Sequence, residues 1–366
     1  MFGHLRFVLA SLVLFSHTGL HFGPVNPGVL AVVSFYLLAG YVVTHLLEHV
    51  FAPGPTRLRR FYAERVLRIF PMYLFICAAT LLFAAATGCG VLRLGWRPIV
   101  AHLLVVPLNY YMKWDCAMLQ LPSGAWPLVP PAWSLGAELQ AYFVLPLVVF
   151  CRPAKVTLAL GSLALCLLAY AGALHPDLFG FRLFPGIFFI FVLGSCVYRT
   201  VHVPKHADRF DRWFPLVCHA ASLVGLVVLT ALGIERAFYR EVFIGLLVGL
   251  PLVNTLARVT AKPARDKLLG ELSYGLFLGH TLATWMLDRA FPGFRDASLP
   301  GALAIFALTL AISFIGVRAV ERPLFRYRRR LTREPVAAPP LEAPRSPADG
   351  TDSHSHGQGG STAPKA

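Results

Sequence analysis

Long stretches without a charged side chain alternate with short arginine clusters along this sequence. Each stretch has the roughly 20 apolar residues that cross the hydrocarbon core of a bilayer as an α-helix. The runs without Asp, Glu, Lys or Arg are Ile69 to Leu92, Val156 to Leu174, Trp213 to Ile234 and Ala297 to Val317. Because backbone polar groups inside lipid must be satisfied within the segment, the pattern predicts an all-α fold, a polytopic transmembrane helical bundle.

Hydropathy predicts about ten such spans and one shorter apolar segment. The spans are expected near 5–21, 29–47, 69–87, 132–150, 156–174, 181–198, 214–233, 240–257, 269–288 and 300–319. The shorter segment, Pro98 to Met112, contains two tyrosines and is followed closely by Trp114, a composition typical of the membrane interface. We interpret it as a re-entrant or interfacial segment.

The positions of Lys and Arg set the orientation of the bundle. With the amino terminus inside, 23 of these side chains up to residue 333 fall on the cytoplasmic side and 8 on the opposite side. Cytoplasmic loops carry such an excess, so we expect a multi-pass protein of the bacterial inner membrane with both termini in the cytoplasm. The same bias accounts for the net charge of +15 without a nucleic-acid partner.

The composition excludes an ordinary soluble protein. Of the 366 residues, 57% are hydrophobic and only 14% are charged, whereas a soluble domain is typically about 25% charged. Residues 334–366 differ from the rest because they are rich in Pro, Ala, Ser, Gly and His and have no apolar periodicity. We therefore expect one transmembrane domain over residues 1–333 and a disordered cytoplasmic tail over 334–366.

The seven cysteines show no spacing typical of a metal site. The pair His354 and His356 is too sparse for one, so no metal is expected. Cys89 and Cys116 fall in segments placed outside the cytoplasm, and a disulfide between them is left open.

Ionisable side chains inside a bilayer are costly, which makes each of them a candidate for function. Arg6 and His17 are eleven positions apart in the first predicted helix, so they point to one face about 16 Å apart along the axis. Arg6 would mark the cytoplasmic mouth of a cavity, and His17 would lie well inside the protein. The alternative is that Arg6 only anchors the end of the helix at the membrane surface and that His17 makes a structural hydrogen bond.

Arg65 and Arg68 form a second candidate where the third span enters from the cytoplasm. Arginines at i and i+3 share a helix face, and a helix N-terminus adds partial positive charge. Two guanidinium groups there could grip a diphosphate. The competing interpretation is that these arginines only anchor the cytoplasmic end of the span, as the positive-inside rule predicts.

Further polar groups lie near the start of two other predicted spans. Trp133 and Ser134 precede Glu138, which comes about one turn into the fourth span and could orient His17 or contact an acceptor hydroxyl. His280 lies about two turns into the ninth span, where it could line the same cavity or make a structural hydrogen bond. The triplet Glu321-Arg322-Pro323 is interpreted as a charged stop to the last span.

The order of these motifs along one chain is more specific than any of them alone. The series is Arg6-x10-His17, Ser34-Phe35-Tyr36-Leu37-Leu38-Ala39-Gly40-Tyr41, Arg65-x-x-Arg68-Ile69-x-Pro71, Trp133-Ser134-Leu135-x-x-Glu138, Ser273-Tyr274-Gly275-x-Phe277-Leu278-x-His280 and Glu321-Arg322-Pro323. It closely resembles the membrane-bound acyltransferase-3 family, whose members O-acylate sugars of surface polysaccharides and related acceptors. The resemblance covers about residues 1–326, and it departs at Ala39, where the family often has serine.

The resemblance implies a role for each matching residue. His17 would be the catalytic histidine, with Glu138 as a second catalytic candidate. Arg65 and Arg68 would hold the phosphates of an acyl-CoA donor, together with Arg6. Substrate contacts are expected from Trp133, Ser134, Tyr274 and His280.

The function expected from these residues is an integral-membrane O-acyltransferase, in the first instance an O-acetyltransferase. It would use cytoplasmic acyl-CoA, with acetyl-CoA as the simplest donor, and acylate a hydroxyl of a surface polysaccharide or lipid-linked sugar. His17 could act as a general base or become acylated transiently. The alternatives are a transporter or flippase of a lipid-linked or anionic solute, and a non-catalytic scaffold for polysaccharide assembly.

Overall fold

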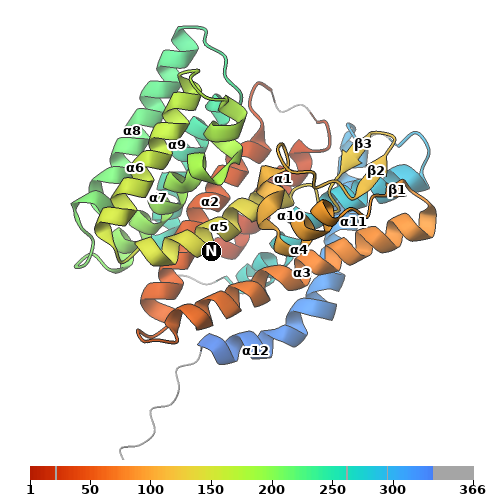
Figure 1. The fold of residues 1–366 in the computed structure, drawn as a ribbon, viewed down its shortest axis with the longest axis horizontal. Coiled ribbons are helices and arrows are strands. Elements are labelled where there is room, and N and C mark those ends of the chain that lie inside the picture. The colour runs from red at the N-terminus through yellow and green to blue at the C-terminus, as the bar shows by residue number, and fades with distance from the viewer. Residues whose placement is uncertain (21–22, 261–262, 295, 333–366) are drawn as a thin grey trace, which may run out of the picture. The chain divides into compact units, whose positions relative to one another are not determined.

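The computed structural model describes residues 1–20, 23–260, 263–294 and 296–332, and these are helical over most of their length (Figure 1). The predicted tail over 334–366 lies outside the described residues. The helices are α1 (Phe2–Ser16), α2 (Pro27–His45), α3 (Arg57–Thr87), α4 (Trp96–Leu104), α5 (Ala132–Val148), α6 (Arg152–Tyr170), α7 (Phe184–His202), α8 (Arg209–Ala231), α9 (Tyr239–Arg258), α10 (Asp266–Ala290), α11 (Leu299–Gly316) and α12 (Arg322–Thr332). Short π-helical turns are Leu46–Val50, Leu178–Arg182 and Val317–Glu321.

Every expected span coincides with one of these helices. Within the described ranges, seven helices are long and apolar enough to cross a membrane, namely α2, α3, α6, α7, α8, α9 and α11. Helices α1 and α5 also match expected spans but have only 15 and 17 residues, and α10 matches the ninth span. The prediction of an all-α, polytopic transmembrane bundle is therefore confirmed.

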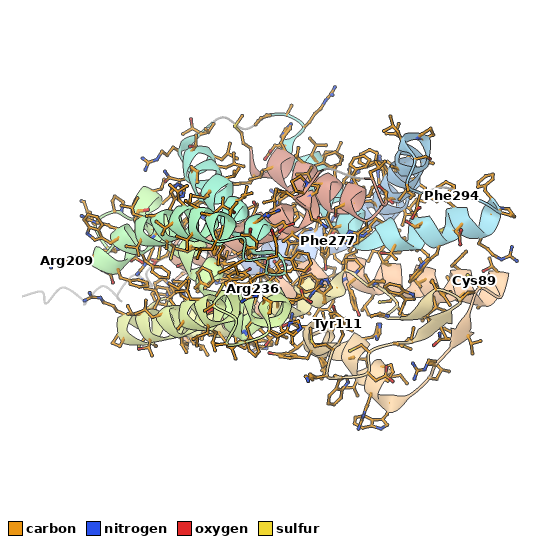
Figure 2. All side chains as sticks on the ribbon, turned by 90° about the horizontal axis from the view of Figure 1, so that it is seen from above. Cys89, Tyr111, Arg209, Arg236, Phe277 and Phe294 are labelled. Carbon is orange, nitrogen blue, oxygen red and sulfur yellow. The ribbon has the colours of Figure 1, made fainter. Side chains whose placement is uncertain are left out.

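The chain between α3 and α5 is too broken to cross a bilayer. Helix α4 has 9 residues, which is about 14 Å of helix, and at Val105 (φ 64°) the chain turns into a 3₁₀ helix over Val106–Tyr110. This region also carries a small antiparallel sheet in the order β1-β2-β3, formed by β1 (Val91–Leu92), β2 (Leu119–Leu121) and β3 (Gly124–Trp126). Figure 2 labels Cys89 and Tyr111 in this region. Strands of two or three residues leave no alternating pattern, so the sequence did not indicate the sheet.

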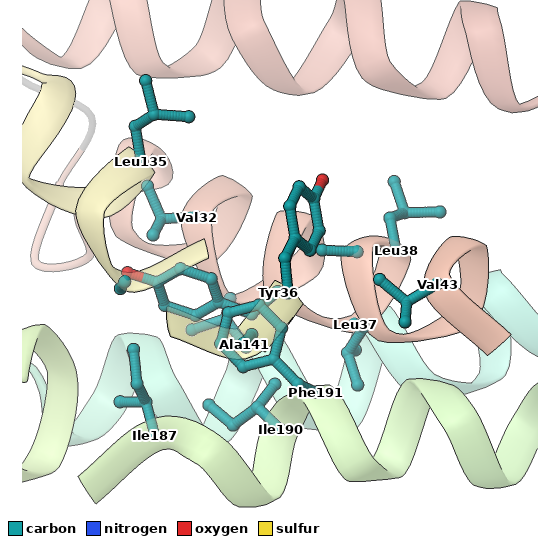
Figure 3. Close-up of a cluster of buried hydrophobic side chains, with 14 of the residues drawn as sticks. Val32, Tyr36, Leu37, Leu38, Val43, Leu135, Ala141, Ile187, Ile190 and Phe191 are labelled. Atoms are coloured by element: carbon teal, nitrogen blue, oxygen red, sulfur yellow. The ribbon is translucent and has the colours of Figure 1, made fainter. Parts of the chain in front are cut away.

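Helix α2 lies in the core and packs closely against α7. A Cβ atom at Gly40 would stand 1.8 Å from the carbonyl oxygen of Phe191, and one at Gly194 would stand 1.9 Å from that of Leu37. Small residues allow such close approach between helices in membranes. Buried side chains of α2, α5 and α7 fill the space around this contact, as Figure 3 shows for Tyr36, Leu37 and Phe191.

Three expectations about helix ends are wrong. The first helix was expected to run to residue 21 with His17 well inside the protein. Instead α1 ends at Ser16, and His17 is its exposed C-cap. The physical reason is local, because the His17 Nδ1 lies 2.7 Å from the Val13 carbonyl oxygen and Gly19 follows in the left-handed conformation at φ 71°.

The second correction concerns the arginine pair. Helix α3 begins at Arg57, so Arg65 and Arg68 lie two to three turns inside it rather than at its N-terminus. The helix dipole acts mainly over the first turn, and it therefore contributes little at this pair. Within this arginine-rich first half of the helix, the buried carboxylate of Glu64 offsets the charge of Arg65.

The third correction concerns Glu321, which does not stop the last helix. The chain continues from α11 through the π-helical turn Val317–Glu321 into α12. Pro323 falls in the first turn of α12, where its missing N–H is tolerated. Glu321 instead accepts a hydrogen bond from Arg68, with Nη1 to Oε1 at 3.1 Å.

Candidate active site

A cavity of about 970 Å³ opens among α1, α2, α3, α5, α10 and α12. Cationic side chains dominate its charged lining, and all of them lie near the span ends that are predicted to be cytoplasmic. They are Arg6, Arg65, Arg68, Lys267, Arg322, Arg326, Arg328 and Arg329, against the carboxylates Glu138, Asp266, Glu271 and Glu321. Elsewhere the lining is apolar, with Phe35 of α2, Leu135 of α5 and Phe277 of α10. We call this the inner cavity.

Arg65 and Arg68 both have carboxylate partners within the protein. The Arg65 Nε donates to Glu64 Oε2 at 2.6 Å, and the same carboxylate binds Arg328 at 2.8 Å. Arg68 binds Glu321 and lies over the ring of Tyr274 at 5.4 Å. These ion pairs hold both guanidinium groups in place on the cavity wall.

Arg6 differs from the other two arginines. Within the described part of the chain its guanidinium makes no hydrogen bond or ion pair, although it is half-buried and lines the inner cavity. The charges of Arg68, Arg65 and Glu138 all act on it. An unpaired, partly buried guanidinium beside two others is a ready site for an anion.

Glu138 also lines the inner cavity and faces the arginines. The Tyr142 hydroxyl donates to its Oε1, and the ring of Tyr142 lies 5.5 Å from the guanidinium carbon of Arg65. No hydrogen bond joins Glu138 to His17 among the described residues, so the carboxylate is not placed to orient that imidazole. It lowers the net positive charge of the cavity instead.

His17 lies in a second, smaller cavity of about 100 Å³, which we call the outer cavity. Trp133 and Ser134 line it too, together with aromatic rings gathered around Arg182. The Arg182 guanidinium stands 5.0 Å from the Trp133 ring and is held by Asp177, with Nε to Oδ1 at 2.6 Å. The two cavities therefore separate the predicted histidine from the predicted donor-binding arginines.

The hydrogen bonds of His17 define its tautomer. A carbonyl oxygen only accepts, so the contact with Val13 requires a proton on Nδ1 and leaves a lone pair on Nε2 in the neutral ring. His280 shows the same arrangement, because its Nδ1 lies 2.8 Å from the Phe277 carbonyl oxygen. Its buried Nε2 has no hydrogen-bond partner in the described chain.

The structure brings the predicted site residues together in two groups. Arg6, Arg65, Arg68, Glu138 and Tyr274 line the inner cavity, His17 and Trp133 line the outer cavity, and Ser134 lines both. His280 lines neither, but its ring centre is 5.0 Å from that of His17.

Other site residues were missed from the sequence. These are Glu64 and Arg328 beside Arg65, Tyr142 beside Glu138, Glu321 as the partner of Arg68, and Arg182 in the outer cavity. The scarcity of acidic residues, 18 Asp and Glu in all, was a usable signal for Glu64 and Glu321. No signal in the sequence pointed to Arg328, because its contact with Glu64 joins segments far apart in sequence.

Comparison with known proteins agrees with this architecture. A family described as an acyltransferase domain matches residues 2–318. A protein of Aquifex aeolicus (strain VF5), described as uncharacterized, is 33% identical over 224 residues, which is 61% of this chain and 100% of that protein. No solved structure matches. The chain therefore belongs to the acyltransferase-3 family and is a multi-pass membrane acyltransferase that transfers groups other than amino-acyl groups.

Proposed function

We propose that this enzyme is an O-acyltransferase of the bacterial inner membrane, with both termini in the cytoplasm. It takes an acyl group, most simply acetyl, from cytoplasmic acyl-CoA and transfers it to a hydroxyl of a surface polysaccharide or lipid-linked sugar. The observation that carries this proposal is the unpaired guanidinium of Arg6 in a cationic cavity. The family membership sets aside the transporter, flippase and scaffold alternatives.

The inner cavity suits a donor with a phosphorylated head and an apolar arm. Its volume of about 970 Å³ falls at the upper end of the usual range for ligand pockets, roughly 300–1,000 Å³. Arg6 would bind phosphate directly, and Arg65 and Arg68 would add positive charge from their fixed positions. The apolar surface of Phe35 and Phe277 would accompany the pantetheine arm.

The outer cavity suits a sugar. Trp133 and Phe238 are half-buried beside Arg182, whose guanidinium carbon lies 5.0 and 5.5 Å from their ring centres, and their exposed surface would contact a pyranose. His17 is exposed beside them. An acceptor hydroxyl could therefore reach the imidazole from the side opposite to the donor.

The reaction follows from the tautomer of His17. Its Nε2 would accept the proton of the acceptor hydroxyl as the oxygen attacks the thioester carbonyl carbon, the C–S bond would break, and the proton would pass to the departing thiolate. General-base help of this kind contributes roughly 10² to 10⁴ in rate. Transient acylation of Nε2, followed by transfer to the sugar, gives the same products.

Radiolabelled acetyl-CoA tests the proposal directly. Inverted membrane vesicles containing the enzyme should incorporate label into glycan material, with release of free CoA. Mass spectrometry of surface glycans from cells with and without the protein should show the corresponding acetyl groups. Absence of label with acetyl-CoA and with longer acyl-CoA esters would contradict the assigned donor.

A further inference from the structure

The inner and outer cavities meet at three residues. Val32 of α2, Ser134 of α5 and Phe277 of α10 line both of them. Arg6, Arg65 and Arg68 line only the inner cavity, and His17 lines only the outer one. If the donor is bound by these arginines, its acyl group must pass Val32, Ser134 and Phe277 to reach the imidazole.

The three side chains form a septum between the two cavities, and two of them, Val32 and Phe277, are apolar. Val32 and Ser134 are only 6% and 7% exposed, and the Ser134 hydroxyl donates to the Pro131 carbonyl oxygen at 3.1 Å. The Phe277 ring packs against Phe35 with ring centres 6.0 Å apart. Figure 2 labels Phe277, and Figure 3 shows Val32 within the buried cluster around α2.

The space beyond the septum is small. The outer cavity has a volume of about 100 Å³, about a tenth of that of the inner cavity. An acyl chain that reaches His17 from the inner cavity must therefore pass between the side chains that the two cavities share. A longer chain would have to displace Val32 or Phe277, and close-packed protein interiors resist such displacement.

We infer that Val32, Ser134 and Phe277 form a septum that selects the transferred acyl group by size and restricts the enzyme to short acyl chains. The inference rests on the proposed function and adds the specificity-determining residues to it. Phe277 also connects the septum to the histidines, because its carbonyl oxygen accepts from the Nδ1 of His280, whose ring lies beside that of His17.

The test compares two substitutions on the same helix. Val32→Ala widens the septum, whereas Val33→Ala makes the same change at a buried residue that lines neither cavity and packs near Gly245 of α9. The measured quantity is kcat/KM for butyryl-CoA divided by kcat/KM for acetyl-CoA, with the full-length enzyme in proteoliposomes. One methylene in an apolar pocket changes discrimination by roughly 10- to 200-fold. Val32→Ala should therefore raise the ratio at least about tenfold, and Val33→Ala should leave it as in the parent.

Phe277→Leu is the second variant and keeps the test decisive if Val32→Ala does not fold. It should raise the same ratio, with folding checked by thermal unfolding in detergent. If the parent enzyme transfers acetyl but the folded septum variants keep the parental ratio, the septum inference is wrong and the proposed function stands. If the parent uses no acyl-CoA ester, the proposed function itself fails.

Discussion

The inner and outer cavities differ in the kind of side chain that surrounds them. The inner cavity is walled by guanidinium groups held in ion pairs, whereas the outer cavity is small and aromatic and holds the exposed imidazole of His17. The difference indicates that the two cavities have separate roles. Positive charge suited to a phosphorylated ligand is concentrated in the inner cavity, and the imidazole suited to proton transfer lines the outer one.

The arginines of the inner cavity also differ from one another. Arg65 and Arg68 are tied to Glu64 and Glu321, and removing either carboxylate leaves a buried or half-buried cation without its partner. Arg6 has no such partner in the described part of the chain. The paired arginines thus support the structure of the wall, while Arg6 is the cation available to a ligand.

The largest expected effect comes from the outer cavity. His17→Ala should lower kcat by roughly 10² to 10⁴, because it removes the proposed base, and should leave the Kd for the donor unchanged, because the donor site is in the inner cavity. Turnover assays and equilibrium binding of radiolabelled acetyl-CoA measure the two quantities. His219→Ala, in α8 and outside both cavities, is the matched control. Full turnover in His17→Ala would remove the histidine from the mechanism.

The second effect concerns stability rather than turnover. Glu64→Gln removes the charge that compensates both Arg65 and Arg328, and breaking a buried ion pair costs about 3–5 kcal/mol. Thermal unfolding of the purified protein in detergent should show a clearly lowered Tm. Glu235→Gln, which breaks an exposed pair with Arg240, should change stability by no more than about 1 kcal/mol. Equal shifts in the two variants would contradict a structural role for the Glu64 cluster.

Arg6→Ala should weaken donor binding with little change in stability. Hydrogen bonds to charged groups contribute about 1.5–3 kcal/mol, so the Kd for acetyl-CoA should rise roughly 10- to 150-fold. Arg6→Lys should restore part of the affinity, since it keeps the charge but loses the two-pronged contact. The control is Arg209→Ala, which removes an exposed arginine at the start of α8. If all three variants bind acetyl-CoA with the same affinity, Arg6 does not bind the donor.

The smallest effect lies at the start of α10, before the predicted span. Burial opposes ionisation of Asp266, but hydrogen bonds from His4 and the amino terminus outweigh it and hold the pKa of the carboxyl well below its usual range. Such a group stabilises the fold at pH values above the unfolded-state pKa of about 3.9, and the contribution disappears as the pH falls through the lower folded-state pKa.

Asp266→Asn should therefore lower the Tm at pH 7 by the equivalent of about 1 kcal/mol. The difference from the parent should shrink as the pH falls well below 4. Asp288→Asn, at the exposed far end of the same helix, should have no comparable effect. Equal Tm values for Asp266→Asn and the parent at pH 7 would show that Asp266 is not the stabilising group.

Much of the architecture could be predicted from the sequence. Charge-free runs of about 20 residues leave only helices as spanning elements, so the bundle and the approximate position of each expected span followed from hydropathy. The motif series around His17, Arg65 and Glu138 indicated an acyltransferase, and the family match confirms it. These features are local, because each depends on residues that are close together in the chain.

The tertiary structure alone decided which of those residues share a cavity. The placement of Arg6 and His17 in different cavities depends on how α1, α2, α5 and α10 pack. The pairing of Arg65 and Arg328 through Glu64 joins segments more than 260 residues apart. Hydropathy specifies that a helix crosses the membrane but not its rotation or its neighbours, since these are set by side-chain packing and ion pairs between helices.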